Sequence, residues 1–435
     1  MLGILARIWT LFTGPLTVAI ISRSFSKEVQ GFYYTFSSIL ATQMVFELGF
    51  SRVIMQFISH LWPSLKRLPD GRLDGEPETL QRLQAILRLA IGWFSWGSLI
   101  FMVCLIAGGR YFFREYSQSN VVWSQPWIAM VVTASLLFAC IPIWALLEGC
   151  HQMNAVTRVR LQISVIFSLT TWTSMSLGAG LWTGAIGNLA ILLWTIGFFL
   201  TQYRSLIASV IFTSHLPNSR SIRSEIWAIQ WRTSLGAVHG YFFFQMFTPV
   251  MFAARGAAEA GKIGMTWSLI SAIRALAETV ILTKGPIFGG MVAQRRYDEL
   301  ERLVYVTGRT AVALSLLGAV AVEVFLELLR LYKFNLADRL LDPSTAGCLL
   351  LASVFMQVSS AQGAHLRAFA KEPYARFALV NSVILAVGLP LLARHGGSWW
   401  LCLGYLADVC LIMVPWNHYL WLKYRRIWHV KDSPE

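Results

Sequence analysis

Long apolar runs separated by short polar segments recur along the whole chain of 435 residues. A helix needs about 20 mostly apolar residues to cross the hydrocarbon core of a bilayer, and the pattern predicts about twelve such helices. Their centres lie near Val18, Ile39, Leu99, Leu137, Ser168, Leu192, Phe244, Ser271, Leu317, Val354, Leu385 and Leu411. The sequence therefore predicts an all-α integral membrane protein.

Composition supports this prediction. Hydrophobic residues make up 56% of the chain and charged residues 13%, with a mean hydropathy of +0.57, whereas soluble domains are about a quarter charged. The first apolar stretch, Leu2 to Ile21, is interpreted as a retained helix and not as a cleaved leader. The reason is that Arg7 interrupts it and no convincing small-x-small cleavage site follows.

No catalytic or metal-binding pattern stands out. The six cysteines are scattered without a CxxC pair, and the eight histidines are equally dispersed, so neither a disulfide framework, a metal site nor a cofactor is expected. GxSxG, HExxH and Walker motifs are missing from the sequence. The predicted outer loops are short, whereas a membrane glycosyltransferase or polymerase should carry a large outer loop with catalytic residues. The sequence therefore predicts a protein that is not an enzyme.

The net charge of +14 is explained by membrane topology. If the N-terminus is inside, the inner loops carry about twice as many Lys and Arg residues as the outer loops, which is the bias that sets orientation. Because this asymmetry accounts for the excess of cations, no nucleic-acid partner is expected. The prediction is a multi-pass protein with both termini in the cytoplasm.

Two halves of the chain repeat one design. Pro15 precedes Gly31, and Pro249 precedes Gly264 by nearly the same spacing; each glycine is predicted to close a short, charged outer turn. Six spans per half would make the halves parallel repeats about an axis normal to the membrane. The predicted domains are an N-terminal six-helix bundle over residues 1–205, a cytoplasmic linker over 206–232, and a C-terminal six-helix bundle with a short tail over 233–435.

The segment from Gly14 to Phe57 contains two apolar runs around a short polar turn, and its second run carries Phe46-Glu47-Leu48-Gly49-Phe50 followed by Arg52. This layout resembles the opening helix pair of the polysaccharide and O-antigen flippase branch of the multidrug/oligosaccharidyl-lipid/polysaccharide (MOP) exporter superfamily. Together with the repeat, the resemblance covers essentially the whole chain. It implies two six-helix bundles around a central cavity, with first and seventh helices that bend between inward-open and outward-open states.

The resemblance also implies a function. Flippases of this branch move an undecaprenyl-diphosphate-linked oligosaccharide across the bacterial inner membrane for the synthesis of cell-surface polysaccharide, such as the O-antigen of lipopolysaccharide. The implied partners are the lipid-linked oligosaccharide and membrane lipids, with a polysaccharide polymerase and chain-length proteins beside them.

Charges inside predicted spans are the candidate substrate-binding residues, because a charge at mid-bilayer costs about 2.5 to 3.5 kcal/mol and usually faces the bundle interior. They are Glu47 and Arg52 in the second predicted helix, and Arg274, Glu278 and Lys284 in its counterpart. Arg274 and Glu278 are four residues apart and share a helix face, and a guanidinium binds phosphate oxygens through paired hydrogen bonds. The alternatives are a pair that only neutralises itself, and snorkelling of Arg52 and Lys284 to the inner interface.

Two further sets of residues are candidates for mechanism. Glu323 and Asp408 are predicted ion-coupling residues, since carboxylates in spans often mark ion pathways; the alternative is a structural role in an interhelical hydrogen bond. Pro15 and Pro249 are predicted hinges, because a proline inside a helix removes a hydrogen bond and clashes with the preceding turn. The alternative for both is a static kink.

Two other functions stay open. A cation-coupled drug or metabolite exporter would share the fold but should have a predominantly acidic interior. The predicted interior is mixed, with Arg52, Arg274 and Lys284 against Glu47 and Glu278, which favours an anionic cargo. A membrane-embedded glycan polymerase or ligase is disfavoured by the short outer loops.

Overall fold

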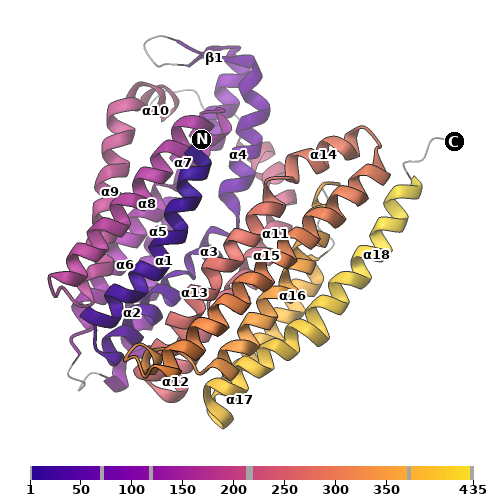
Figure 1. The fold of residues 1–435 in the computed structure, drawn as a ribbon. Helices are drawn as coiled ribbons and strands as arrows, with labels where there is room; N and C mark the ends of the chain where they lie inside the picture. Colours follow the sequence, from indigo (N-terminus) through magenta and orange to yellow (C-terminus); the bar gives the residue numbers. More distant parts are fainter. Residues whose placement is uncertain (1, 69–72, 117–120, 212–218, 370–373, 432–435) are drawn as a thin grey trace. The chain divides into compact units, whose positions relative to one another are not determined.

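The computed structural model describes residues 2–68, 73–116, 121–211, 219–369 and 374–431 (Figure 1). Almost all of these residues are helical, which confirms the predicted all-α membrane fold. A short antiparallel hairpin joins two of the helices. It consists of β1 (Leu65–Arg67) and β2 (Leu73–Gly75), and Leu65 pairs with Gly75.

The chain forms two compact units. The first unit contains Met1–Trp9, Ala19–Phe25 and Phe36–Tyr241, and the second contains Thr10–Val18, Ser26–Thr35 and Phe242–Glu435. Helices α1 (Leu2–Ser24) and α2 (Lys27–Leu40) therefore contribute residues to both units. The described residues of the predicted linker, 206–232, belong to two helices, and the predicted domain boundaries stay a prediction.

The helices of the first unit after α2 are α3 (Gln43–Glu47), α4 (Phe50–Leu61), η1 (Trp62–Ser64), α5 (Pro77–Phe112), η2 (Arg114–Tyr116), α6 (Ser124–Ala139), α7 (Ile141–Gly149), α8 (Met153–Ser176), α9 (Trp182–Gln202), α10 (Arg204–Ile211) and most of α11 (Ser219–Phe244). In this unit α6 packs against both α5 and α9, α8 packs against α9, and α4 packs against α7. The contacts thus join helices that are neighbours in the sequence, such as α5 and α6, and helices that are not, such as α4 and α7.

Polar side chains and a glycine bring the helices of the first unit together. Ser98 on α5 donates a hydrogen bond to the carbonyl of Ser135 on α6 at 2.6 Å. The indole Nε1 of Trp127 donates to the carbonyl of Leu105 at 3.1 Å, and a side chain at Gly109 would overlap that indole. Interhelical hydrogen bonds and small residues at contacts are the usual means of helix association in a bilayer.

The helices of the second unit are α12 (Phe247–Arg255), α13 (Ala257–Leu282), α14 (Gly285–Ala293), α15 (Tyr297–Leu331), η3 (Ala337–Arg339), α16 (Pro343–Arg367), α17 (Ala375–Ala407), the π-helical turn η4 (Asp408–Met413) and α18 (Val414–Lys431). Helix α16 packs against α13, α15, α17 and α18, and these helices run beside it in Figure 1. Of the candidate spans, α16 has the largest buried share, 61% of its most apolar window. It is the central helix of this unit.

Seven helical segments of the described chain are long and apolar enough to cross a membrane, or eight if a bent pair, Lys27–Glu47 with Phe50–Ser64, counts as one span. Every predicted span centre lies in or beside a helix. Two of the centres, Leu385 and Leu411, lie in one helical segment of 53 residues, Arg376–Trp428, formed by α17, η4 and α18. The segment is kinked between the two centres, because Gly397 inside α17 has a non-helical backbone with φ of 66° and ψ of −150°. The other predicted spans fall in helices that do not meet the length and hydropathy criteria.

Gly31 and Gly264 lie inside α2 and α13, so the prediction that each closes an outer turn is wrong. Both serve close packing within the second unit. A side chain at Gly31 would collide with the backbone of Ala257, and a side chain at Gly264 would overlap the side chain of Tyr34 on α2. The glycines are needed because the backbones of α2 and α13 touch, which small residues permit.

The two prolines occupy different positions in their helices. Helix α1 continues through Pro15, and Thr17 donates a hydrogen bond to the carbonyl of Thr13 at 2.6 Å. Pro249 lies in the first turn of α12, after a break that follows Phe244. The break lies one turn before Pro249, where a proline ring clashes with the preceding backbone. The hinge role of Pro249 stays a prediction.

Candidate functional site

The charged pair predicted in the second half lies on one face of α13. Arg274 Nη1 is 3.7 Å from Glu278 Oε2, and the two side chains are 22% and 21% exposed. This separation allows electrostatic attraction but is too long for a hydrogen bond. The guanidinium therefore keeps donor capacity that Glu278 does not use.

Each member of this pair has a further contact in the second unit. The guanidinium carbon of Arg274 lies 4.5 Å from the ring centre of Phe244, a cation–π distance. Ser360 on α16 donates a hydrogen bond to Glu278 Oε2 at 3.0 Å. The Nε atom of Arg274 is buried and has no hydrogen-bond partner among the described residues. A buried donor without an acceptor costs about 1–3 kcal/mol, so the pair with Glu278 leaves the guanidinium incompletely satisfied.

Lys284 and Glu323 lie away from this pair, with no contact to it among the described residues. Lys284 is half-buried and immediately precedes α14. Glu323 lies on α15 close to Gly347 of α16, and its Oε2 atom is buried without a hydrogen-bond partner in the part of the chain that the structure describes.

Asp408 is the first residue of η4, the π-helical turn between α17 and α18, and it is 5% exposed. Asn381 on α17 donates a hydrogen bond to its Oδ2 atom at 3.3 Å, and Oδ1 has no partner among the described residues. A π-helical turn often marks a functional position. One oxygen of Asp408 thus has a structural hydrogen bond, and the ion-coupling role of this residue stays a prediction.

The second predicted helix is broken between Glu47 and Arg52. Leu48 and Gly49 both have left-handed backbone angles, with φ of 53° and 70°, and the helices on either side meet at a bend of 45°. Glu47 ends α3, whereas Arg52 lies in the first turn of α4. The prediction of one continuous helix is therefore wrong at this point. The only sequence signal for the break was Gly49, a residue that adopts positive φ without strain.

Glu47 and Arg52 nevertheless line one cavity in the first unit, of about 580 Å³. Its walls are Glu47, Ser51, Arg52 and Met55 with Ile141, Trp144, Ala145 and Glu148 of α7 and Arg160 and Ile163 of α8. Ser51 donates a hydrogen bond to the Glu47 carboxylate. The cavity thus contains charges of both signs.

Two charged residues of this cavity were missed by the sequence analysis. Glu148 and Arg160 form an ion pair across α7 and α8. Glu148 is a single acid at the end of an apolar run, and Arg160 lies in the next helix along the chain. Their pairing depends on the contact between two helices, which no spacing within either helix reveals.

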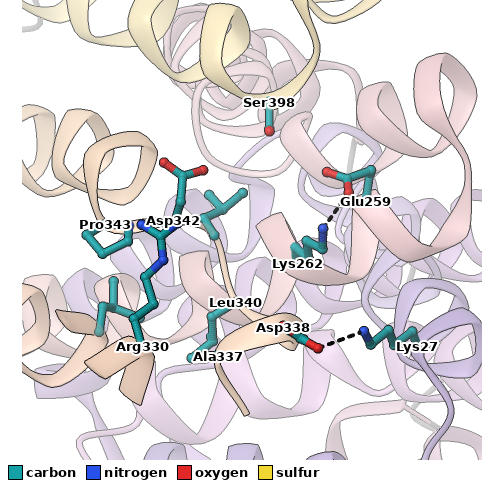
Figure 2. Close-up of a pocket in the computed structure, with 12 residues that line it drawn as sticks. Lys27, Glu259, Lys262, Arg330, Ala337, Asp338, Leu340, Asp342, Pro343 and Ser398 are labelled. Atoms are coloured by element: carbon teal, nitrogen blue, oxygen red, sulfur yellow. Dashed lines mark hydrogen bonds and ion pairs between the residues drawn. The ribbon is translucent and has the colours of Figure 1, made fainter. Parts of the chain in front are cut away.

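A second cavity, of about 390 Å³, lies beside η3 in the second unit (Figure 2). It is charged: Lys27 Nζ lies 3.5 Å from Asp338 Oδ2, and Lys262 Nζ lies 2.6 Å from Glu259 Oε1. Arg330 also lines it. The cations belong to segments that the topology prediction places outside, so this cavity is predicted to lie at the outer end of the unit.

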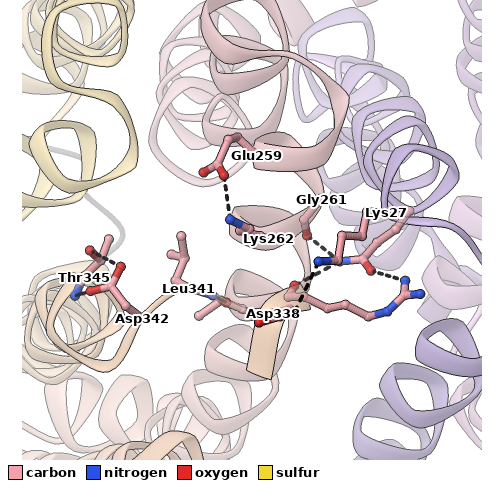
Figure 3. Close-up of polar contacts among 11 residues, drawn as sticks. Lys27, Glu259, Gly261, Lys262, Asp338, Leu341, Asp342 and Thr345 are labelled. Atoms are coloured by element: carbon pink, nitrogen blue, oxygen red, sulfur yellow. Dashed lines mark hydrogen bonds and ion pairs between the residues drawn. The ribbon is translucent and has the colours of Figure 1, made fainter. Parts of the chain in front are cut away.

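Hydrogen bonds fix the segment from η3 to α16 that forms one wall of this cavity (Figure 3). Asp342 caps α16, with its Oδ2 atom 3.0 Å from the Thr345 nitrogen. Burial raises the pKa of Asp342, but the hydrogen bonds from Ser344 and Thr345 outweigh it, and the resulting pKa lies below the usual range. The Leu341 nitrogen donates to Thr266 Oγ1 at 2.9 Å, which ties the segment to α13.

No protein-family profile and no curated protein sequence matches the chain. Solved structures do resemble it. An inward-facing multidrug resistance transporter of the MATE family, in the MOP superfamily, has a TM-score of 0.66 at 13% identity over 98% of this chain and 96% of its own. The lipid II flippase MurJ in an inward closed conformation gives 0.64 at 13% over 100% and 92%. A MOP superfamily transporter from Pyrococcus furiosus gives 0.56 at 13% over 97% and 93%. The chain therefore has the fold of MOP superfamily transporters.

Proposed function

We propose that the chain is a membrane transporter that moves a lipid-linked oligosaccharide, carried on undecaprenyl diphosphate, across the bacterial inner membrane for cell-surface polysaccharide synthesis. The fold supports transport, since it is shared with a lipid II flippase and with multidrug transporters. The resemblance of the segment from Gly14 to Phe57 to polysaccharide flippases supports the cargo class.

The observation that carries the proposal is the state of Arg274. Its side chain lies in a membrane helix, partly buried, with its carboxylate neighbour beyond hydrogen-bond distance and its Nε atom without a partner among the described residues. Ser360 holds Glu278 in place, and Glu278 in turn attracts the guanidinium electrostatically. Arg274 is thereby oriented but not neutralised by hydrogen bonds, which suits a diphosphate, whose oxygens accept two parallel bonds from one guanidinium.

A cation-coupled drug or metabolite exporter is the second candidate. Asp408 favours it, since a buried carboxylate with one unbonded oxygen suits a proton or a metal cation. The two candidates predict opposite charges for the cargo. In a flippase, Asp408 and Glu323 would bind the coupling ion and Arg274 the cargo. In a cation-coupled exporter, the two carboxylates would bind both the coupling ion and the cargo.

The test is a flipping assay in proteoliposomes with an undecaprenyl-diphosphate-linked sugar, beside an efflux assay with a cationic dye. We expect Arg274→Ala to slow flipping by about tenfold or more, because a charge-assisted hydrogen bond contributes about 1.5–3 kcal/mol. Arg274→Lys should recover only part of the rate, since a lysine lacks the planar fork. Arg376→Ala, which removes an exposed arginine at the start of α17, is the matched control. Normal flipping by Arg274→Ala/Glu278→Ala would reduce the pair to a structural role, and dye efflux without flipping would favour the exporter.

We further propose that both termini face the cytoplasm. In a variant without the native cysteines, a cysteine at Ser24 should react with an impermeant maleimide added to intact cells, and one at Ser64, beside β1, should not. Both positions are exposed, so access depends on the side of the membrane. The reverse labelling pattern would invert the orientation.

A further inference from the structure

A groove of about 920 Å³ lies in the second unit between α15, α16 and α18, apart from the sites described above. It is lined by Asp298, Glu301, Arg302, Val304, Tyr305, Gly308, Arg309, Val312, Ala313, Leu316, Val358, Ala361, Gln362, His365, His418, Trp421 and Arg425. Its side is open, since Tyr305 is 65% and Leu316 48% exposed. Sites of this size and largely apolar character hold ligands of a few hundred daltons.

The groove changes from charged to apolar along its length. On α15 the lining residues Arg302, Tyr305, Arg309, Val312 and Leu316 follow one helical stripe, from cations near the start of the helix to aliphatic residues two turns later. The walls formed by α16 and α18 also change in polarity along the groove, in the same direction as α15. Arg425 lies at the charged end of α18 with His418 two turns before it, and on α16 the aliphatic Val358 precedes His365 by two turns.

The arginines at the charged end differ in their contacts. Arg425 binds Glu301 through both Nε and Nη2, each at 2.5 Å, so its charge is already compensated. Arg309 lies over the ring of Tyr305 at 5.6 Å, and Arg302 is exposed. Neither Arg302 nor Arg309 has an ion pair with a carboxylate of the described chain. Asp298 and Glu301 also line this end, and the three arginines leave it with a net positive charge where the apolar groove begins.

The middle of the groove is polar and contains hydrogen bonds between two helices. Gln362 and His418 Nδ1 are joined by a hydrogen bond of 2.9 Å, and Trp421 donates to His365 Nδ1 at 2.7 Å. Gln362 is only 8% exposed, and its Oε1 atom has no partner among the described residues. These contacts join α16 to α18 at the groove.

We propose that this groove binds an anionic glycerophospholipid, with the phosphate at Arg302 and Arg309 and one acyl chain along the aliphatic residues of α15 and α16. Charge complementarity selects a lipid with a net negative headgroup, since a zwitterionic headgroup would bring its own cation toward two arginines. The open side of the groove lets a lipid enter from the bilayer. A juxtamembrane arginine attracts anionic lipid by about 1 kcal/mol, and a defined groove adds apolar contact to that attraction.

This lipid site is separate from the Arg274 and Glu278 pair. On α16, Ser360 contacts Glu278, whereas Val358, Gln362 and His365 line the groove. The two sets of residues lie on different faces of the helix. The inference therefore does not depend on which cargo the chain transports.

The experiment measures binding of pyrene-labelled phosphatidylglycerol to the purified full chain in phosphatidylcholine nanodiscs, and counts retained lipids by native mass spectrometry. We expect saturable binding of phosphatidylglycerol. Arg302→Gln/Arg309→Gln should weaken it by about tenfold or more, as should Ala313→Trp, which fills the groove at an exposed position and leaves the arginines in place. Arg376→Gln is the control that removes an exposed charge elsewhere.

Each result bears on the proposal. Loss of binding in both the arginine pair and Ala313→Trp, with normal binding in Arg376→Gln, supports a site for headgroup and chain together. Unchanged affinity in both variants overturns it. Equal binding of labelled phosphatidylcholine would show that the groove does not select a negative headgroup. Competition by inorganic phosphate alone at equal affinity would show that the acyl chain does not contribute to binding. Either result rejects the lipid site as stated.

Discussion

The carbonyl oxygen of Leu48 accepts a hydrogen bond from Gln230 Nε2 at 2.8 Å, although the two residues are far apart in the sequence. Leu48 has a left-handed backbone at the break between α3 and α4, where carbonyls lose their helical partners. Freed backbone groups at membrane depth persist only where other groups satisfy them. Gln230 is 2% exposed and supplies that partner from α11. The bond thus stabilises the bend that separates Glu47 from Arg52.

Gln230→Leu should therefore destabilise the first unit. The change keeps the size of the side chain but leaves the Leu48 carbonyl without its main donor, at a cost of about 1–3 kcal/mol. Ser234, whose hydroxyl lies 3.5 Å from the same carbonyl, recovers only part of this. The measurement is thermal unfolding in detergent. Gln202→Leu, at an exposed position, should leave the midpoint unchanged, and equal midpoints for the two variants would contradict the role of the bond.

Gly31→Ala tests the close packing of α2 against α13. The new methyl group would collide with the backbone of Ala257, and neither backbone can move without displacing its helix. We expect a loss of about 1–3 kcal/mol in the free energy of unfolding, as for other overpacked sites. Gly108→Ala is the matched control, because a Cβ there meets no atom within 4 Å. That control should be neutral or stabilising by up to about 1 kcal/mol, since alanine has the higher helix propensity.

The helical membrane fold could be predicted from the sequence because it follows from hydropathy and length, which are local properties. The position of Arg274 four residues before Glu278 likewise fixes their common face on α13. The contacts that complete this pair, Phe244 and Ser360, could not be predicted, since they come from other helices. Their geometry is set by helix packing, for which a single sequence gives no measure.

The errors of the sequence analysis have a common cause. Gly31, Gly264 and Gly49 look alike in the sequence but have different roles. Gly31 and Gly264 permit close contact between helices, whereas Gly49 permits a left-handed backbone at a helix break. Glycine indicates that the backbone needs freedom or space but does not say which. The ion pair between Glu148 and Arg160 was missed for a related reason, because it joins residues on two helices.

Asp342 should make the stability of the second unit depend on pH. Its folded-state pKa lies below the ordinary value of 3.8, because the hydrogen bonds from Ser344 and Thr345 outweigh the effect of burial. A lowered pKa contributes stability above the unfolded-state pKa, and that contribution is lost as the pH falls through the folded value. The loss is therefore expected below about pH 4.

Two variants separate charge from capping at Asp342. Asp342→Asn can still cap α16, so it should reduce the decline in unfolding temperature between about pH 5 and pH 3. Asp342→Ala removes the cap and should cost about 1 kcal/mol at neutral pH. The measurement is the unfolding midpoint of purified protein over this pH range. A decline in Asp342→Asn as steep as in the unmodified protein would assign the pH dependence to other carboxylates.

Pro15 and Pro249 should differ in their effect on the proposed transport. Pro15 lies inside α1 and offers no N–H to the carbonyl one turn earlier, so this helix has a weak point where bending costs little. Pro249 lies in the first turn of α12, where no hydrogen bond within the helix requires its N–H. Pro15→Ala should therefore stiffen α1 and slow flipping in proteoliposomes while leaving affinity for the lipid-linked substrate unchanged, because a hinge alters a conformational step and not a contact. Pro249→Ala is the matched control and should flip at the normal rate. A normal rate in Pro15→Ala would show that α1 does not act as a hinge, and a slow rate in Pro249→Ala alone would move the hinge to the start of α12.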